Sequence, residues 1–342
     1  MSVRSQTPAV LLFAGLALFP FAARFGAQAY LLSLGARTLI LALAALSLDF
    51  LVGQAALVSF GHAAYLGIGA YAVALASMAG IDDLFLQALA AIIVATLFAA
   101  LTGYVSLRAR GVYYIMSTLA FGQMLYFLFV SLSVFGGDDG YTLSNRSLLF
   151  GKPCLTGDVA FYYFCLAVLA LAYLLLMRIA GSRFGRVLNA IRQNPLRAGA
   201  LGFRRFRFQL AACAIAGAIA AVAGTLLANQ SEFVAPAFMS WQRSGELLVM
   251  TILGGVGSLW GAVLGAIVYL TLEEALSLLT DQTHVILGPL LVAVALFGRR
   301  GLAGALTPRA AGGEALARRC CALKDWPRAL ARWRSPTTSP SA

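Results

Sequence analysis

The sequence predicts an all-α fold, a polytopic transmembrane helix bundle of about 8 to 10 spans with some glycine-interrupted segments. Of its 342 residues, 61% are hydrophobic and only 11% are charged, and the mean hydropathy is +0.86. A soluble domain carries roughly 25% charged residues, so this chain has too few charges to cover a surface in water. A soluble enzyme and a largely disordered chain are therefore excluded. The separated cysteines also exclude a disulfide scaffold.

Charged residues divide the chain into apolar runs, several of which have the length of about 20 residues that crosses the hydrocarbon core. The first run is interpreted as a retained span, because no small-residue cleavage site follows it. The first two runs are short and the third is long. In order, the predicted runs are Val10–Ala23, Thr38–Leu48, Phe50–Ile81, Leu84–Leu107, Gly111–Phe135, Val159–Met177, Phe208–Asn229, Leu247–Leu272 and His284–Gly298.

The distribution of charge predicts the orientation of the bundle. Residues 178–207 contain eight arginines and no acid, and Arg108 and Arg110 lie between two runs, so both loops are expected in the cytoplasm. The acidic pairs Asp82–Asp83 and Asp138–Asp139 and the loop at Glu232 are expected outside. Arg24 and Arg37 do not fit this rule, because the count of spans places them outside as well.

The glycine-rich run Leu247–Leu272 decides on which side the chain ends. As a single span it would place the acidic loop 273–281 in the cytoplasm and the basic tail outside, against the charge rule. Two shorter passes hinged at Gly254–Gly257, either two spans or a re-entrant hairpin, restore that rule. Non-helical backbone at membrane depth needs protein or water to satisfy it, so this hinge indicates a pathway. Gly257, Gly261 and Gly265 share one helix face and predict a close packing seam.

Residues 1–300 are thus the predicted transmembrane domain, with a cytoplasmic loop at residues 178–208. Residues 301–342 form a basic, proline-containing cytoplasmic tail that is expected to be disordered. Within the loop, apolar positions alternate with arginines from Ser182 to Gly202. They predict two short amphipathic helices broken at Asn194-Pro195, which could contact lipid headgroups or dock onto a partner protein.

Few residues could carry chemistry inside the membrane. Ionisable groups at bilayer depth cost about 2.5–3.5 kcal/mol and are usually retained for function, which singles out His62 and Asp49. Asp49 could instead lie at the membrane edge. His62 could bond a neighbouring helix carbonyl, line a polar path or fix a backbone break that Gly61 allows. Ser59 lies three residues before His62, so a catalytic dyad is a weak alternative.

Nucleotide and metal chemistry are not expected in this chain. The glycine cluster Gly254-Gly255-Val256-Gly257-Ser258 lacks the lysine of a phosphate-binding loop, so the chain should not hydrolyse ATP. The histidines, His62 and His284, have no ligand partners at metal-binding spacing.

Several separated motifs carry a family resemblance over residues 35–300. The segment from Asp49 to Tyr71, which includes Ser59-Phe60-Gly61-His62-Ala63-Ala64-Tyr65, is similar to the signature of the branched-chain amino acid ABC transporter permease family, the inner-membrane subunits of high-affinity importers. The remaining motifs follow in the expected order: Arg110-Gly111-Val112-Tyr113-Tyr114, Gly136-Gly137-Asp138-Asp139-Gly140, Phe184-Gly185-Arg186, Ile191-Arg192-Gln193-Asn194, Ala200-Leu201-Gly202 and Leu253-Gly254-Gly255-Val256-Gly257-Ser258.

The resemblance implies an ABC importer permease fold and a transport subunit that is not an enzyme. Its partners would be a second, related but distinct permease subunit, two ABC ATPase subunits, a periplasmic substrate-binding protein and membrane lipid, without nucleic acid. No cofactor would be bound by this chain, because ATP is used by the ATPase subunits. The chain would be a multi-pass protein of the bacterial inner membrane with a cytoplasmic C-terminus.

Two sets of site residues follow from the matched motifs. The translocation pathway is expected at Asp49, Ser59, Gly61, His62, Gly254, Gly255, Gly257 and Ser258. Coupling to the ATPases is expected at Arg186, Arg192, Asn194, Ala200 and Gly202. Alternative functions are import of urea, short amides or other small organic solutes by the same family, a stand-alone channel or secondary transporter, and a membrane-embedded enzyme.

Overall fold

The computed structural model describes residues 7–23, 28–109, 111–143, 146–148, 157–278, 288–289 and 301–306. Residues Met1–Ala305 form one compact unit, and Leu306–Ala342 form a second. The predicted last span, His284–Gly298, and the predicted basic tail, residues 301–342, lie almost entirely outside the described residues.

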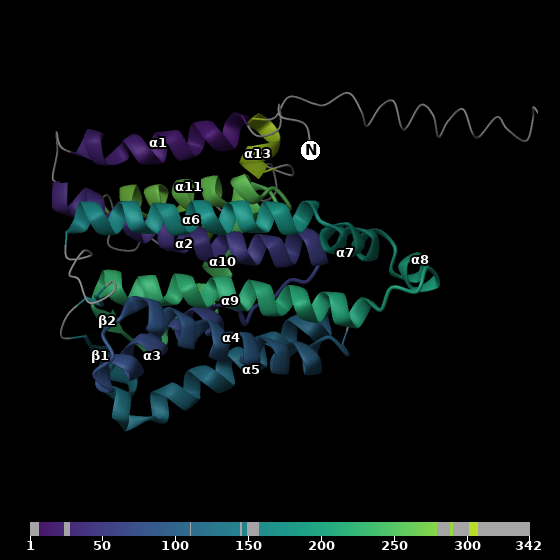
Figure 1. Cartoon of the computed structure of the whole chain (residues 1–342), viewed down its shortest axis with the longest axis horizontal. Helices are drawn as coiled ribbons and strands as arrows, with labels where there is room; N and C mark the ends of the chain where they lie inside the picture. Colours follow the sequence, from purple (N-terminus) through teal and green to yellow (C-terminus); the bar gives the residue numbers. More distant parts are fainter. Residues whose placement is uncertain are drawn as a thin grey trace, which may run out of the picture. The chain divides into compact units, whose positions relative to one another are not determined.

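Helices make up most of the first unit (Figure 1). The longer helices are α1 (Thr7–Ala23), α2 (Gln28–Ala55), α3 (His62–Met78), α4 (Leu84–Ser106), α5 (Val112–Ser131), α6 (Asp158–Gly181), α9 (Arg205–Ser231), α10 (Trp241–Gly254) and α11 (Leu259–Ser277). Within the described residues, six helices are long and apolar enough to cross a membrane, and α1 and α3 are shorter apolar helices. The all-α, polytopic fold class is confirmed.

Short elements join these helices. They are the 3-10 helices η2 (Ser133–Phe135), η3 (Gly137–Asp139) and η4 (Pro236–Met239), the helices α7 (Arg183–Gln193), α8 (Pro195–Ala200) and α13 (Gly301–Leu306), and the strands β1 (Tyr141–Thr142) and β2 (Phe233–Val234). The two strands pair antiparallel, with Tyr141 opposite Val234. This pair ties the loop after α5 to the loop after α9.

Helix α2 lies at the centre of the first unit and packs against α6, α9, α10 and α11 (Figure 1). Small residues let the neighbouring helices approach closely. A Cβ at Gly224 of α9 would lie 1.8 Å from the carbonyl oxygen of Leu66 in α3, and one at Gly69 would lie 2.0 Å from that of Ala221. In a bilayer such close packing replaces the hydrophobic effect as the force between helices.

The outer helices present apolar side chains away from this core. In the most apolar 18-residue stretch of α2 and of α9, 67% of the residues are buried, whereas in that of α5 only 17% are. Large apolar side chains such as Leu97 of α4 and Phe127 of α5 are 71% and 62% exposed. A contiguous apolar surface of this kind suits contact with lipid, so α4 and α5 lie at the periphery of the bundle.

The structure corrects the predicted boundaries of two runs. Thr38–Leu48 and Phe50–Ile81 were separated at Asp49, but α2 continues through Asp49 to Ala55 and also contains Arg37. A carboxylate is tolerated inside this helix because the backbone N–H of Gly257 donates to it. The chain leaves helical geometry only at residues 56–61, before α3 begins at His62.

The two-pass interpretation of residues 247–272 is confirmed. α10 and α11 form a helical hairpin whose turn, residues 255–258, contains Gly255 at φ 107° and Gly257 at φ 86°. Their backbones are in close contact, since a Cβ at Gly265 would lie 2.1 Å from the carbonyl oxygen of Met250. The alternative of a single span is wrong, because the positive φ values of Gly255 and Gly257 stop the helix.

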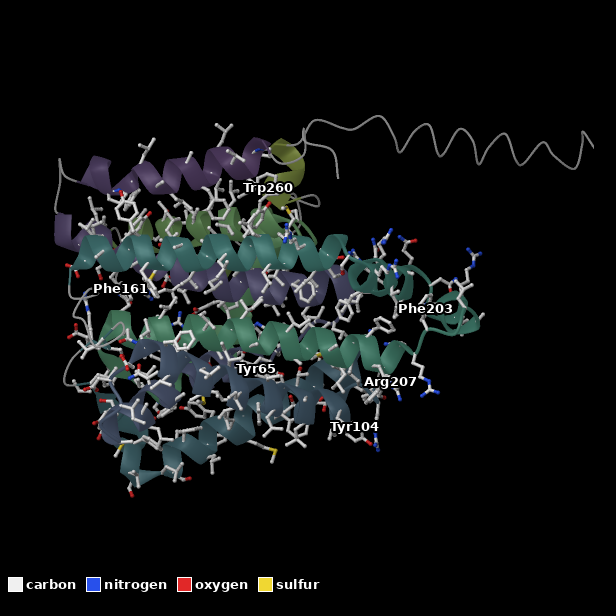
Figure 2. All side chains as sticks on the ribbon, in the orientation of Figure 1. Tyr65, Tyr104, Phe161, Phe203, Arg207 and Trp260 are labelled. Atoms are coloured by element: carbon white, nitrogen blue, oxygen red, sulfur yellow. The ribbon has the colours of Figure 1, made fainter. Side chains whose placement is uncertain are left out.

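The bundle has two ends of opposite charge. One end, called the acidic end, carries Asp82, Asp83, Asp138, Asp139 and Glu232 in its loops near β1 and β2. The other, called the arginine end, carries α7, α8 and the first turn of α9, and Figure 2 shows Phe203 and Arg207 there. The predicted separation of acidic from basic loops is therefore confirmed.

Candidate functional site

Two interrupted helices meet inside the bundle near the arginine end. α2 ends at Ala55, and the turn of the α10–α11 hairpin lies directly against its last turns. A Cβ at Gly53 would lie 2.5 Å from the Cα of Gly257, so the two backbones touch with no side chain between them. We call the group formed by Asp49, Gly53, Arg192, Gln209 and Gly257 the junction.

Asp49 joins α2 to the hairpin turn. Its side chain is buried, with 1% of the residue exposed. Oδ1 accepts a hydrogen bond of 2.7 Å from the backbone N–H of Gly257. Oδ2 has no hydrogen-bond partner among the described residues. Asp49 therefore lies in the interior of the protein, against a non-helical turn.

The end of α2 is satisfied by side chains from the arginine-rich segment. The last carbonyls of a helix have no partner within it. The Arg192 guanidinium donates to the carbonyl of Gly53, and Gln209 Nε2 donates to the carbonyl of Ala55 at 3.2 Å. Arg205 Nε holds Gln209 in place through a 2.8 Å bond to Oε1.

Arg192 is thus the link between the surface helix α7 and the interior. It lies in the last turn of α7, and much of the residue is exposed. Its guanidinium nevertheless reaches the junction, where it also interacts electrostatically with Asp49. A Cβ at Gly257 would lie 3.6 Å from Arg192 Nη1, so one side chain touches both interrupted helices.

The predicted amphipathic pair in the arginine-rich segment is confirmed as α7 and α8. Ser182 caps α7 by accepting from the N–H of Gly185, and Asn194 caps α8 by accepting from those of Leu196 and Arg197 at 3.1 and 3.0 Å. Asn194 and Pro195 separate the two helices as predicted, because Asn is a strong N-cap and Pro suits the first helical position.

The other predicted coupling residues lie around this pair. Arg186 is exposed on α7, Ala200 is the last residue of α8, and Gly202 follows it at φ 85°. Together with Asn194 they line the surface of the arginine end. Of the predicted coupling residues, only Arg192 makes a hydrogen bond to the junction.

His62 starts α3 on the other side of the break. Its side chain is fully buried, and Nε2 lies 2.7 Å from Ser47 Oγ of α2. Because Ser47 donates its proton to the carbonyl of Ala44 at 2.7 Å, the hydrogen-bond network assigns the proton of this contact to Nε2. Nδ1 has no partner among the described residues.

Neighbouring helices hold the first turn of α3. Ser244 Oγ of α10 accepts from the N–H of Ala63 at 3.0 Å, and Thr118 Oγ1 of α5 accepts from that of Phe60 at 3.3 Å. Gly61 packs directly on the Thr118 carbonyl, which a Cβ would meet at 2.2 Å. The predicted backbone break at Gly61 is thus present, with side chains of two neighbouring helices bonding its backbone.

The remaining predicted pathway residues separate into two groups. Gly254, Gly255 and Ser258 belong to the hairpin turn, where Ser258 Oγ donates to the carbonyl of Gly255 at 2.7 Å. Ser59 is buried in the break before α3. His62 pairs with Ser47 and not with Ser59, so the structure does not form the dyad considered from the sequence. In the described part of the chain, no group of three or more His, Cys, Asp or Glu could hold a metal ion.

Sequence reasoning missed Gly53, Gln209, Ser47, Ser244 and Thr118. Gly53 stands in the quoted signature, and its position four residues after Asp49 is the helical spacing that places both on one face. The others are polar residues within apolar helices, a signal that could have identified them.

Comparisons with known proteins identify the family of this chain. Residues 30–295 match the family model described as the permease component of branched-chain amino acid transport systems. The high-affinity branched-chain amino acid transport system permease protein LivM of Salmonella typhimurium is 27% identical over 289 residues, which cover 78% of this chain and 68% of that protein. BraD of Pseudomonas aeruginosa is 27% identical, over 77% of this chain and 91% of that protein.

A second kind of permease matches as well. LivH of Salmonella typhimurium is 28% identical over 285 residues, which cover 77% of this chain and 91% of that protein. No solved structure matches the chain. The family model covers more than half of the sequence and includes both interrupted helices and the arginine-rich segment, so this multi-pass membrane protein belongs to the family of permease components of branched-chain amino acid transport systems.

Proposed function

We propose that this chain is the membrane-spanning permease subunit of an ABC importer for branched-chain amino acids. A periplasmic binding protein delivers the substrate at the acidic end, and separate ATPase subunits at the arginine end drive its passage. The family match supports the transport role. The alternative substrates within the same family are urea, short amides and other small organic solutes.

The observation that carries this proposal is the hydrogen bond from Arg192 to the end of α2. α7 lies at the surface of the bundle, whereas α2 is its central helix. A displacement of α7 withdraws the donor from the Gly53 carbonyl and a positive charge from Asp49. It therefore loosens the contact between α2 and the hairpin turn, the two places where the helices are already interrupted.

The surface of α7 and α8 suits docking of an ATPase. Leu196 and Leu201 are 85% and 74% exposed, and Arg183 and Arg186 are exposed beside them. Apolar side chains surrounded by cations can enter an apolar groove with an acidic rim on a partner. Through this contact, closure of the ATPase subunits on ATP reaches Arg192.

The remaining assignments follow from the family. The names LivM and LivH denote two permease proteins of such systems, which supports pairing of this chain with a related but distinct permease subunit. The chain itself binds no cofactor, ATP being used by two ATPase subunits. The charge rule supports an inner-membrane orientation with the arginine end and the C-terminus in the cytoplasm.

Arg192→Gln tests the proposal in the assembled transporter, reconstituted in liposomes with its second permease, ATPases and binding protein. We expect ATP-driven uptake of labelled leucine to fall at least tenfold while ATP hydrolysis continues, because the contact between α7 and the junction is lost. Arg183→Gln is the matched control, since Arg183 is an exposed arginine of the same helix, and it should retain uptake. Normal uptake by Arg192→Gln would contradict the proposed coupling, and a wild-type assembly that takes up no branched-chain amino acid would contradict the proposed substrate.

A further inference from the structure

A cavity of about 350 Å³ with both charged and apolar side chains in its wall opens among the central helices at the acidic end. Its walls come from α2, α9, η4, α10 and α11, on the far side of the bundle from the junction. This volume lies at the lower limit for small-molecule sites, roughly 300–1,000 Å³. The cavity is therefore large enough for one small solute.

Two residues of opposite charge line the cavity without a described ion pair. Arg37 of α2 and Glu274 of α11 both line it and are both half-buried. Within the described residues, neither side chain takes part in a hydrogen bond or an ion pair. By contrast, Arg243, which also lines the cavity, pairs with Glu246 at 2.6 Å.

Arg37 is exceptional among the arginines at the acidic end. The described arginines there are Arg37, Arg146 and Arg243. Arg146 pairs with Asp158 and Glu232, each at 2.9 Å, and Arg243 pairs with Glu246. The charge rule disfavours cations at this end of a membrane protein. Arg37 interacts electrostatically with Tyr269 but makes no ion pair with a described residue, so its guanidinium is available to a ligand.

The remaining wall combines apolar side chains with the polar residues Ser33, Gln230 and Ser231. Leu34, Leu41, Leu227 and Phe238 contribute carbon surface. The two helices that carry the leucines are joined across the cavity by a 3.0 Å hydrogen bond from Gln230 to Ser33. The site therefore combines an arginine, a carboxylate and branched or aromatic carbon within one pocket.

We propose that this cavity, defined by Arg37 and Glu274, binds the transported solute as a zwitterionic amino acid with an apolar side chain. The α-carboxylate lies against the Arg37 guanidinium, whose planar fork suits a carboxylate. The ammonium group lies against Glu274, and the aliphatic side chain lies against the leucines and Phe238. The inference rests on the proposed function and adds to it a substrate site in the permease itself, where the binding protein releases its cargo.

The test measures binding of labelled L-leucine, at millimolar concentration, to the full-length chain in lipid nanodiscs without a binding protein. The wild-type chain should bind leucine saturably. Arg37→Gln and Glu274→Gln should each weaken binding at least tenfold. Arg37→Lys should retain more binding than Arg37→Gln because it keeps the charge. Asp139→Asn, an exposed carboxylate at the same end, is the matched control and should bind like the wild type.

A competition arm needs no substitution and so cannot be confused with misfolding. 4-Methylpentanoate lacks the ammonium group of leucine, and isopentylamine lacks its carboxylate. Each should compete at least tenfold less well than unlabelled leucine, because each leaves either Arg37 or Glu274 without its partner on the ligand. Equal competition by either compound would show that the cavity does not read a zwitterion and would overturn the inference.

Uptake by the assembled transporter distinguishes failure of the proposed substrate site from failure of the proposed function. If that assembly imports leucine while the chain alone binds none, the cavity is not a substrate site, and the proposed function stands. If the assembly imports no branched-chain amino acid, the proposed function fails and the inference that rests on it fails too.

Discussion

The contact between Gly53 and Gly257 gives the sharpest prediction, because it is fixed by backbone atoms on both sides. In Gly53→Ala the added Cβ would lie 2.5 Å from the Cα of Gly257 and 2.9 Å from its nitrogen. Ordinary carbon contacts are about 3.5–4.0 Å. The hairpin turn must therefore retreat from α2 by about 1 Å, since no side-chain rotation can relieve a clash between backbone atoms.

The size of the effect follows from what that retreat separates. The hydrogen bond from the Gly257 N–H to Asp49 is 2.7 Å long, and a retreat of about 1 Å takes it beyond the range of roughly 2.7–3.2 Å in which such bonds form. Loss of a hydrogen bond to a charged group costs about 1.5–3 kcal/mol. Overpacking adds about 1–3 kcal/mol. Gly53→Ala should thus lower the free energy of unfolding by roughly 2.5–6 kcal/mol.

The assay is thermal unfolding of the purified chain in detergent, together with uptake by the assembled transporter. Gly245→Ala is the control, since Gly245 lies in α10 of the same hairpin and a Cβ there meets nothing within 4 Å. This control should be neutral or slightly stabilising, because alanine favours a helix over glycine by about 0.5–1 kcal/mol. Equal melting midpoints and equal uptake for the two variants would refute the reasoning.

Two further predictions concern side chains on either side of the junction. Ser47→Ala removes the described partner of the buried His62 Nε2, so it should destabilise the chain by about 1–3 kcal/mol. Ser131→Ala is the control, since Ser131 is exposed and bonds its own helix, and it should change stability by no more than about 0.5 kcal/mol. Similar melting curves for Ser47→Ala and Ser131→Ala would show that the contact between Ser47 and His62 contributes little. Leu196→Asp should leave the melting midpoint unchanged, because Leu196 is 85% exposed, and should weaken co-purification of the ATPases at least tenfold. Leu196→Met is the control and should retain co-purification. Undiminished co-purification with Leu196→Asp would exclude the surface of α7 and α8 as the docking site.

Composition and turn residues were sufficient to predict much of the fold. The low charge content predicted a membrane bundle, and the glycines at positions 254–257 predicted the hairpin. Asn194 and Pro195 predicted where α7 ends and α8 begins. In each of these cases the deciding effect is local, either a positive φ, a missing N–H or a cap, so it can be read from neighbouring residues.

Charged residues inside helices account for the wrong boundaries of the predicted apolar runs. The sequence alone suggests that Arg37 and Asp49 end apolar runs, yet both lie within α2. Asp49 is accepted there because the Gly257 N–H, more than 200 residues away in the chain, donates to it. Long-range partners of this kind cannot be inferred from local pattern, and Gln209 was missed for the same reason, because its partner is the Ala55 carbonyl.

The junction also explains why charged groups are used where neutral ones would satisfy the same backbone atoms. Neutral polar groups placed against the Gly257 N–H and the Gly53 carbonyl could bond these two atoms at a smaller desolvation cost. Asp49 and Arg192 attract each other in addition, but only while α7 remains in place. Since Arg192 comes from a surface helix and Asp49 from the central one, moving α7 leaves a carboxylate in the interior without its counter-charge. The pair thus makes the packing of two interrupted helices depend on the position of a surface element, which neutral side chains would do far more weakly.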